Sequence, residues 1–163
     1  VTINRPCSLT VRALKQQGLA NILDDYAMAV FGDQVVYLGG KVMAEEDVVV
    51  LHSHPLEGAT EVVPGIFMGG IQAAAAGVQA GEMQADEFRF FLGSHKWDDP
   101  CQLSKEVREG HWWPGAASRP LILKHCMGLP NPLYLELLDI WGGEYKAWAK
   151  RELSKRSDLE AEE

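Results

Sequence analysis

The stretch DEFRFFLGSHKWDDPCQLSKEVREGHWW, residues 86–113, carries the clearest structural signals of the sequence. Within it, Phe88, Phe90 and Leu92 occupy alternate positions. Successive side chains of a strand point to opposite faces, so this spacing predicts a strand with one wholly apolar face.

A helix is predicted directly after this strand. Asp99 and Pro100 form a typical helix start, with aspartate as the N-cap and proline at the first helical position. The intervening loop, GSHKWDD, contains Gly93, His95 and Trp97, so polar and aromatic groups are presented where a strand ends. Such strand-end loops commonly bind ligands or partners.

Further strands are predicted on the N-terminal side of this segment. VTINRP (1–6) has strand composition and is expected to end at Pro6. The β-branched runs at 34–40 and 47–53 predict two strands paired with each other. The run at 61–70 is interrupted by proline and glycine, which predicts an edge strand or a bent strand.

Helices are predicted between and after the strands. The segment 8–18 is expected to be a short helix capped by Ser8 or Thr10, and 71–82 an alanine-rich helix. In 131–143, Asn131 is the expected N-cap with proline next to it. Clustered strands with interspersed helices predict an α+β single domain over residues 1–153, followed by a charged, mobile tail at 154–163.

The composition limits the classes of function. The 163 residues carry a net charge of −8, which argues against direct binding to nucleic acid because phosphate neutralisation requires clustered cations. Three widely spaced cysteines indicate neither a disulfide framework nor a zinc knuckle. No apolar run approaches the roughly 20 residues of a transmembrane helix. No cofactor motif is present, and a basic protein partner remains compatible with the charge.

The sequence LHSHP (51–55) raises a metal hypothesis. On a strand, His52 and His54 share a face, and H-x-H-P resembles the centre of the JAMM-type metallopeptidase motif. Apolar residues, among them Val63 and Ile66, occupy the stretch where that motif needs serine and aspartate. The two histidines are therefore weak metal candidates, and hydrogen-bonded or half-exposed strand-end histidines are the favoured interpretation.

A thiol hydrolase is a second catalytic hypothesis. Cys101 lies at the start of the predicted helix CQLSKEVREG (101–110), where the helix dipole favours a thiolate, and His95 is nearby in sequence. A buried, inert cysteine is the favoured alternative. The sequence therefore predicts no catalytic residue, although a metal- or thiol-dependent hydrolase stays open.

Blocks spread along residues 1–146 resemble the AlgH/YqgE-like family, whose biochemical function is unknown and whose bacterial members are labelled transcriptional regulators. These blocks are VTINRP, VYLGG, VVPGIFMGG, DEFRFFLGSHKWDDPCQL, HWW and PLYLELLDIWGGEY. The resemblance implies a mixed, bifurcated sheet curled into a pseudo-barrel with helices around it. Members begin with an apolar segment and a first strand pair that are absent here.

The resemblance also implies a location and a surface. The ending LLDIWGGEYKAWAKREL looks like the plant and algal branch, which implies a chloroplast protein docked on a large plastid or thylakoid-associated assembly. We expect a non-catalytic protein-binding, assembly or regulatory module, with an indirect role in transcription as an alternative. Its strand-end loops would supply the binding residues Asn4, Arg5, Gly39, Gly40, Gly93, His95 and Trp97.

Overall fold

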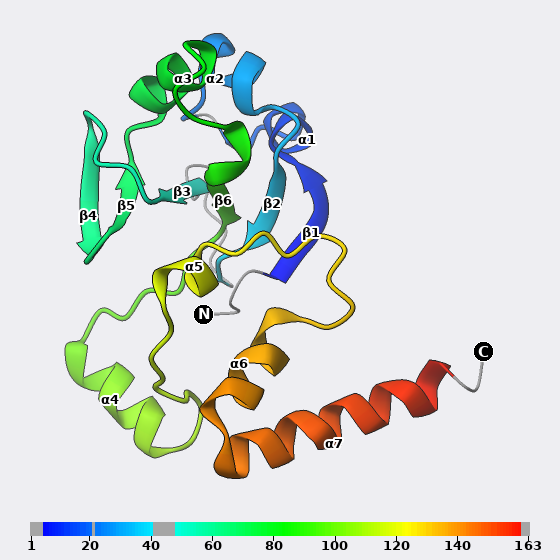
Figure 1. Ribbon diagram of the computed structural model, residues 1–163. Coiled ribbons are helices and arrows are strands. Elements are labelled where there is room, and N and C mark those ends of the chain that lie inside the picture. The colour runs from blue at the N-terminus through cyan, green and yellow to red at the C-terminus, as the bar shows by residue number, and fades with distance from the viewer. Residues whose placement is uncertain (1–4, 21, 41–47, 161–163) are drawn as a thin grey trace. The chain divides into compact units, whose positions relative to one another are not determined.

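The structure, a computed structural model, describes residues 5–20, 22–40 and 48–160, the last five by their backbone alone. Figure 1 shows a twisted sheet with helices at one end, followed by further helical segments. Contacts divide the chain into two compact units, Val1–His125 and Cys126–Glu163. Asn4, one of the predicted binding residues, lies outside the described residues.

The first unit contains a six-stranded mixed sheet with the order β1-β2-β6-β3-β5-β4. Its strands are β1 (Arg5–Thr10), β2 (Val35–Leu38), β3 (Val48–His52), β4 (Ala59–Val63), β5 (Ile66–Gly69) and β6 (Arg89–Leu92). Strands β2 and β6 are parallel, and the other pairs are antiparallel. The predicted α+β class is confirmed. Among the described residues the sheet is not closed into a barrel, because β1 and β4 form its two edges.

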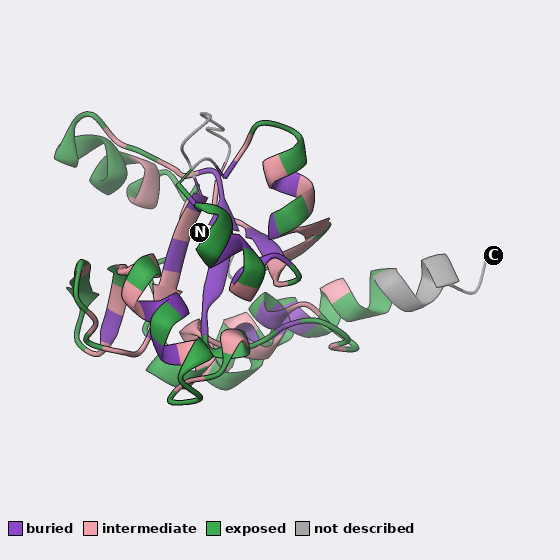
Figure 2. Ribbon diagram, turned by 90° about the horizontal axis from the view of Figure 1, so that it is seen from above, coloured by how far each residue is buried: buried purple, intermediate pink, exposed green. Residues whose placement is uncertain are grey.

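The predicted pairing of the strands at 34–40 and 47–53 is wrong. Strand β6 lies between β2 and β3, and Phe90 is in register with Val36 on one side and Val50 on the other. All four residues of β6 are buried, which agrees with its nearly continuous apolar sequence. The strand that opens the segment 86–113 is thus central to the sheet, as the largely purple central strands in Figure 2 show.

Two predicted strand boundaries also differ from the structure. Strand β1 does not end at Pro6 but continues to Thr10, because proline is tolerated in an edge strand where its missing N–H faces away from the partner. The expected single bent strand at 61–70 is the antiparallel hairpin β4–β5, with Pro64 and Gly65 in its turn. Gly65 has φ +75°, a conformation that favours glycine.

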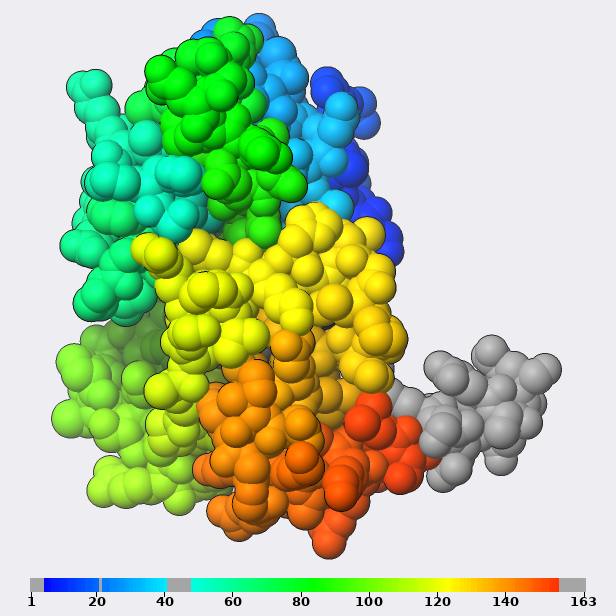
Figure 3. All heavy atoms as spheres, in the orientation of Figure 1, coloured from blue at the N-terminus to red at the C-terminus, as the bar shows by residue number. Residues whose placement is uncertain are grey.

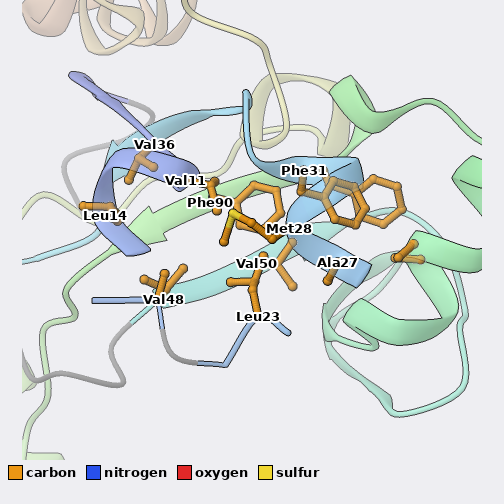
Figure 4. Close-up of a cluster of buried hydrophobic side chains, with 14 of the residues drawn as sticks. Val11, Leu14, Leu23, Ala27, Met28, Phe31, Val36, Val48, Val50 and Phe90 are labelled. Carbon is orange, nitrogen blue, oxygen red and sulfur yellow. The ribbon is translucent and has the colours of Figure 1, made fainter. Parts of the chain in front are cut away.

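Three helices contribute to the core on one face of the sheet: α1 (Val11–Gln16), α2 (Asp25–Phe31) and α3 (Ile71–Gln79). Figure 4 shows apolar side chains of α1 and α2 among those of β2, β3 and β6, and Ala74 and Ala75 of α3 belong to the same cluster. Phe31 packs against Phe88 and Phe90 with ring centroids 5.2 and 5.4 Å apart. This core fixes the position of β6 and therefore of the loop that follows it.

The local signals for helix starts are mostly confirmed. The Thr10 side chain accepts a hydrogen bond from the Ala13 N–H and caps α1, and Asp99 accepts from the Cys101 N–H at the start of α4 (Pro100–Arg108). A short 3₁₀ helix, η1 (Ala85–Glu87), precedes β6, and α5 (Arg119–Ile122) is a single turn.

The second unit consists of α6 (Leu133–Trp141) and α7 (Gly143–Glu160). The N-cap of α6 is Pro132 rather than Asn131, a shift of one residue, and the helix ends at Gly142 with φ +73°. Leu135, Leu138 and Ala149 form its small core. Helix α7 continues through Glu160, into the segment predicted to be a tail. Within the described residues, no helix is long and apolar enough to span a bilayer.

Candidate functional site

An aromatic cluster is formed by His95 and Trp97, in the loop after β6, and Trp112, which follows α4. The His95 ring lies 4.5 Å from the Trp97 ring and 4.9 Å from the Trp112 ring, and the two indoles are 5.4 Å apart. All three side chains are partly exposed. The structure therefore brings together two predicted binding residues, His95 and Trp97, and adds Trp112, which the sequence analysis did not single out.

Glu106 on α4 holds this aromatic cluster together. Its Oε2 accepts hydrogen bonds from the Trp97 Nε1–H at 3.1 Å and the Trp112 Nε1–H at 2.6 Å, while Oε1 accepts from the Gln102 amide at 3.0 Å. Hydrogen bonds from the indoles, that of Trp97 first and that of Trp112 second in size of effect, lower the pKa of the Glu106 carboxyl because they stabilise its charged form. The loop is thus fixed to α4 through one carboxylate.

Helix α4 itself exposes an apolar strip. None of its residues is buried. Leu103 and Val107 are one turn apart on one face, and Leu103 is 38% exposed. The aromatic cluster and this strip lie on the same loop–helix segment, so an apolar and aromatic surface is available to a partner.

The predicted binding glycines have a packing role. A Cβ added at Gly39 would lie 2.1 Å from the Gly93 carbonyl oxygen, and one at Gly40 would lie 2.1 Å from the Ser94 carbonyl. The Gly39 N–H also donates to the Leu92 carbonyl at 2.8 Å. The two backbones therefore continue side by side beyond β2 and β6. Arg5 is exposed at the start of β1.

His52 is fully buried, and both of its ring nitrogens are hydrogen-bonded. Nε2 donates to the Gly69 carbonyl at 3.0 Å, while Nδ1 accepts from the His54 N–H at 3.2 Å. This arrangement requires the neutral tautomer with its proton on Nε2. Burial lowers the pKa of His52, because desolvation penalises the charged ring.

His54 has a different environment. Its ring stacks on Phe88 with centroids 5.6 Å apart, and its Nε2 lies 3.5 Å from the Glu87 Oε2. A metal shared by the two histidines would have to displace a hydrogen bond of His52. Residues 5–20, 22–40 and 48–160 contain no group of three His, Cys, Asp or Glu side chains placed to hold a metal.

The expectation that Cys101 is buried is wrong, because Cys101 is exposed near the start of α4, a helix that buries none of its residues. The His95 ring packs instead against Trp97 and Trp112. The sequence neighbours His95 and Cys101 are thus placed in different surroundings. Cys7 on β1 is half-buried, and its thiol donates to the Val36 carbonyl at 3.0 Å. Burial raises the pKa of Cys7, which disfavours its thiolate.

A polar cleft that the sequence analysis missed lies elsewhere in the first unit. Its volume is about 390 Å³, and its charged lining residues are Asp86, Glu87, Arg89 and Arg119. Arg89 is buried, with 7% of its surface exposed. The only sequence signal for this cleft is an arginine within the apolar run FRFFL (88–92).

Comparisons with known proteins place this fold in a family. Residues 1–146 match the AlgH-like family. A UPF0301 protein from Chlorobium phaeobacteroides is 33% identical over 117 residues, which cover 70% of this chain and 60% of that protein. A UPF0301 protein from Chlorobaculum tepidum is 38% identical over 89 residues, 53% of this chain and 46% of that protein.

A solved structure agrees with this assignment. The solution structure of the AlgH protein from Pseudomonas aeruginosa is similar with a TM-score of 0.54 and 25% sequence identity, covering 83% of this chain and 67% of that one. The chain belongs to the AlgH-like family. The matched regions span 60% and 46% of the lengths of the two Chlorobium-group relatives.

Proposed function

We propose that this chain is a non-catalytic protein-binding module that assembles with, or regulates, a larger complex. The observation that supports the proposal most strongly is the aromatic cluster held by Glu106, next to a helix that buries none of its residues. A cluster fixed before binding loses little side-chain entropy on association, and tryptophan is enriched at the energetically important centres of interfaces.

Helix α4 supports the same proposal. It has nine residues, fewer than the roughly 12–15 at which an isolated helix is even marginally stable in water. Most helices in proteins are stabilised by burying an apolar face, yet Leu103 and Val107 on α4 are not buried. A protein partner that covers Leu103 and the aromatic cluster would provide that stabilisation.

The charge indicates the partner's chemistry. With a net charge of −8, the chain associates fastest with a basic protein surface, because complementary potentials steer the encounter. We place this partner in a plastid or thylakoid-associated assembly, on the resemblance to the plant and algal branch. A regulatory role in transcription would then be indirect, through such a partner.

A metal-dependent hydrolase is the second candidate, because His52 and His54 adjoin in space, with ring centroids 6.2 Å apart. This function requires zinc to compete with the hydrogen bond from His52 to the Gly69 carbonyl. Stoichiometric zinc in the purified protein, lost in a His52→Gln variant, would favour the hydrolase. Substoichiometric zinc whose amount is unchanged in His52→Gln would exclude the metal-dependent hydrolase.

The protein-binding proposal is tested with a matched pair of substitutions. Leu103→Asp places a charge on the exposed strip of α4, and Leu153→Asp does the same on α7 at a similar exposed fraction, 38% against 37%. The intact protein is tagged in its own organism, and the apparent mass of its native complex is measured.

The expected result is a discrete assembly that contains a stoichiometric, basic partner and is lost in Leu103→Asp but retained in Leu153→Asp. A monomeric wild-type protein, or equal behaviour of the two variants, would contradict the proposal.

A further inference from the structure

The polar cleft of the first unit, here called the arginine cleft, is formed by segments far apart in the sequence. Ser53 follows β3, Asp86 and Glu87 belong to η1, Arg89 begins β6, and Arg119 begins α5. In Figure 3 the yellow segment that carries α5 lies against the teal β4–β5 hairpin. The arginine cleft shares no residue with the aromatic cluster, so its function is a separate question.

Arg89 is an unusual buried cation. It is 93% buried, yet no carboxylate of the described residues lies within ion-pair distance of its guanidinium. Nη1 donates to the carbonyl oxygens of Asp86 and Phe88, whereas Nε has no hydrogen-bond partner in the part of the chain that the structure describes. A buried charge is expensive unless it is paired with an opposite charge.

The acidic residues of the cleft do not supply that opposite charge. The Glu87 carboxylate accepts a hydrogen bond from the Gln84 N–H at 2.8 Å and faces His54 at 3.5 Å. The Asp86 contact with Arg89 is through its backbone carbonyl. Arg89 therefore lines the cleft with its charge balanced by neutral carbonyl dipoles only.

A second arginine lies at the same cleft. Arg119 is exposed, and it extends over the turn of the β4–β5 hairpin, where a Cβ added at Gly65 would lie 3.0 Å from its Nη1. A side chain at position 65 would crowd this guanidinium. The absence of a side chain thus leaves room for Arg119 beside the cleft, and no ion pair holds it among the described residues.

We propose that the arginine cleft binds a small oxyanion, the phosphate or carboxylate group of a metabolite, between Arg89 and Arg119. Guanidinium groups bind both oxyanions through charge-assisted and often bidentate hydrogen bonds. Such a ligand would supply the negative charge that Arg89 lacks. The anion would be held by one buried arginine that fixes its position and one exposed arginine that closes over it.

The dimensions and remaining lining groups restrict the ligand further. A volume of about 390 Å³ is at the lower end of the roughly 300–1,000 Å³ typical of small-molecule sites, so the ligand is a small metabolite. Ser53 and Asp86 offer hydrogen-bond acceptors at the same cleft. A hydroxyl or amino group beside the anionic group would complement them.

The test is a titration of the intact protein with inorganic phosphate, monitored by nuclear magnetic resonance. Chloride keeps the ionic strength constant during the titration. The side-chain Nε–H signal of Arg89 reports on the buried arginine directly. A parallel titration with acetate distinguishes a phosphate site from a carboxylate site. Arg119→Gln is the test variant, because Arg119 is exposed and outside the core; Arg108→Gln, an exposed arginine on α4, is the matched control.

The expected result is a saturable shift of the Arg89 signal with phosphate or acetate. The dissociation constant should rise about tenfold or more in Arg119→Gln, because one charge-assisted contact is lost. It should rise less than about twofold in Arg108→Gln. Stronger binding of phosphate than of acetate would assign a phosphorylated ligand, and the reverse a carboxylate. No saturation with either anion, an unshifted Arg89 signal, or equal effects of the two substitutions would overturn the proposal.

Discussion

The ends of β3 and β6 make an instructive comparison, because both carry histidines next to aromatic rings. At the end of β3, His52 is buried and uses both ring nitrogens in hydrogen bonds within the protein. After β6, His95 packs between Trp97 and Trp112 on a partly exposed loop. The first histidine stabilises the fold, and the second belongs to a surface that we propose binds a partner.

The surroundings of each histidine, rather than its spacing in the sequence, therefore decide its role. The H-x-H pattern at 52–54 has the spacing of a metal site, yet the Gly69 carbonyl and the His54 N–H already occupy the nitrogens of His52. The loop GSHKWDD has no catalytic or metal motif, but Glu106 binds its Trp97 together with Trp112.

Replacing His52 is expected to destabilise the fold far more than replacing His95. His52→Ala opens a cavity and leaves the Gly69 carbonyl and the His54 N–H without partners, so it should lower the free energy of unfolding by about 3 kcal/mol. His95→Ala removes partly exposed ring contacts and should cost about 1 kcal/mol or less. Urea unfolding of both variants measures the difference. Equal costs would contradict the distinction between a buried structural histidine and a surface histidine.

A smaller effect is expected at the backbone contact that positions the loop after β6. Gly40→Ala would place a Cβ 2.1 Å from the Ser94 carbonyl, which forces the two backbones apart and should cost about 2 kcal/mol. Thermal or urea unfolding measures this cost. A cost below about 0.5 kcal/mol, as for an ordinary surface substitution, would show that the close approach is absent.

The pH dependence of stability sharpens the description of His52. Because burial lowers its pKa in the folded state, the unfolded chain binds a proton more readily than the folded chain. The contribution of neutral His52 to the free energy of unfolding is therefore fully present above the usual histidine pKa of 6.5. It is lost as the pH falls below that value toward the pKa of His52 in the folded state. Urea unfolding of wild type and His52→Gln between neutral and mildly acidic pH should show a shallower decline in the variant. Parallel declines would exclude His52 as the titrating group.

The smallest effect on stability is expected at Glu106, but its effect on local structure should be clear. Glu106→Ala removes the shared acceptor of the Trp97 and Trp112 indoles, so near-ultraviolet circular dichroism and tryptophan fluorescence should change while global unfolding changes little. Glu109→Ala, at the C-cap of α4 and without a hydrogen bond to either indole, is the control. Unchanged tryptophan spectra in Glu106→Ala would contradict the described cluster.

Short-range signals in the sequence predicted local structure well. Asp99 with Pro100 marked the start of α4, and Thr10, one of the two expected caps, caps α1. These features depend on residues within one or two turns, where capping and backbone preferences act. Strand order was not predictable in this way, because β6 pairs with β3 and β2 residues that lie about 40 and 54 positions earlier in the chain, and no local preference specifies that pairing.

The candidate sites show the same contrast between local signals, which were predictable, and long-range contacts, which were not. His95 and Trp97 were identified because they lie in one loop after a recognisable strand. Trp112 and Glu106 were not among the predicted binding residues, because their contacts depend on the direction in which α4 leaves that loop. The arginine cleft was also missed: Ser53 and Arg119 are brought together by the fold, and Arg89 alternates with phenylalanines in a pattern that equally suits an exposed face.

The most direct test of the account places a photo-crosslinking side chain at Leu103 on α4 and, separately, at Leu153 on α7, two leucines of similar exposed fraction. The intact protein is crosslinked in its native setting, and the products are identified. The account predicts one predominant, basic protein crosslinked from position 103 and weakened by Trp97→Ala, with little product from position 153. Equal products from both positions, or none from position 103, would contradict the claim that the loop after β6 and helix α4 form the binding surface.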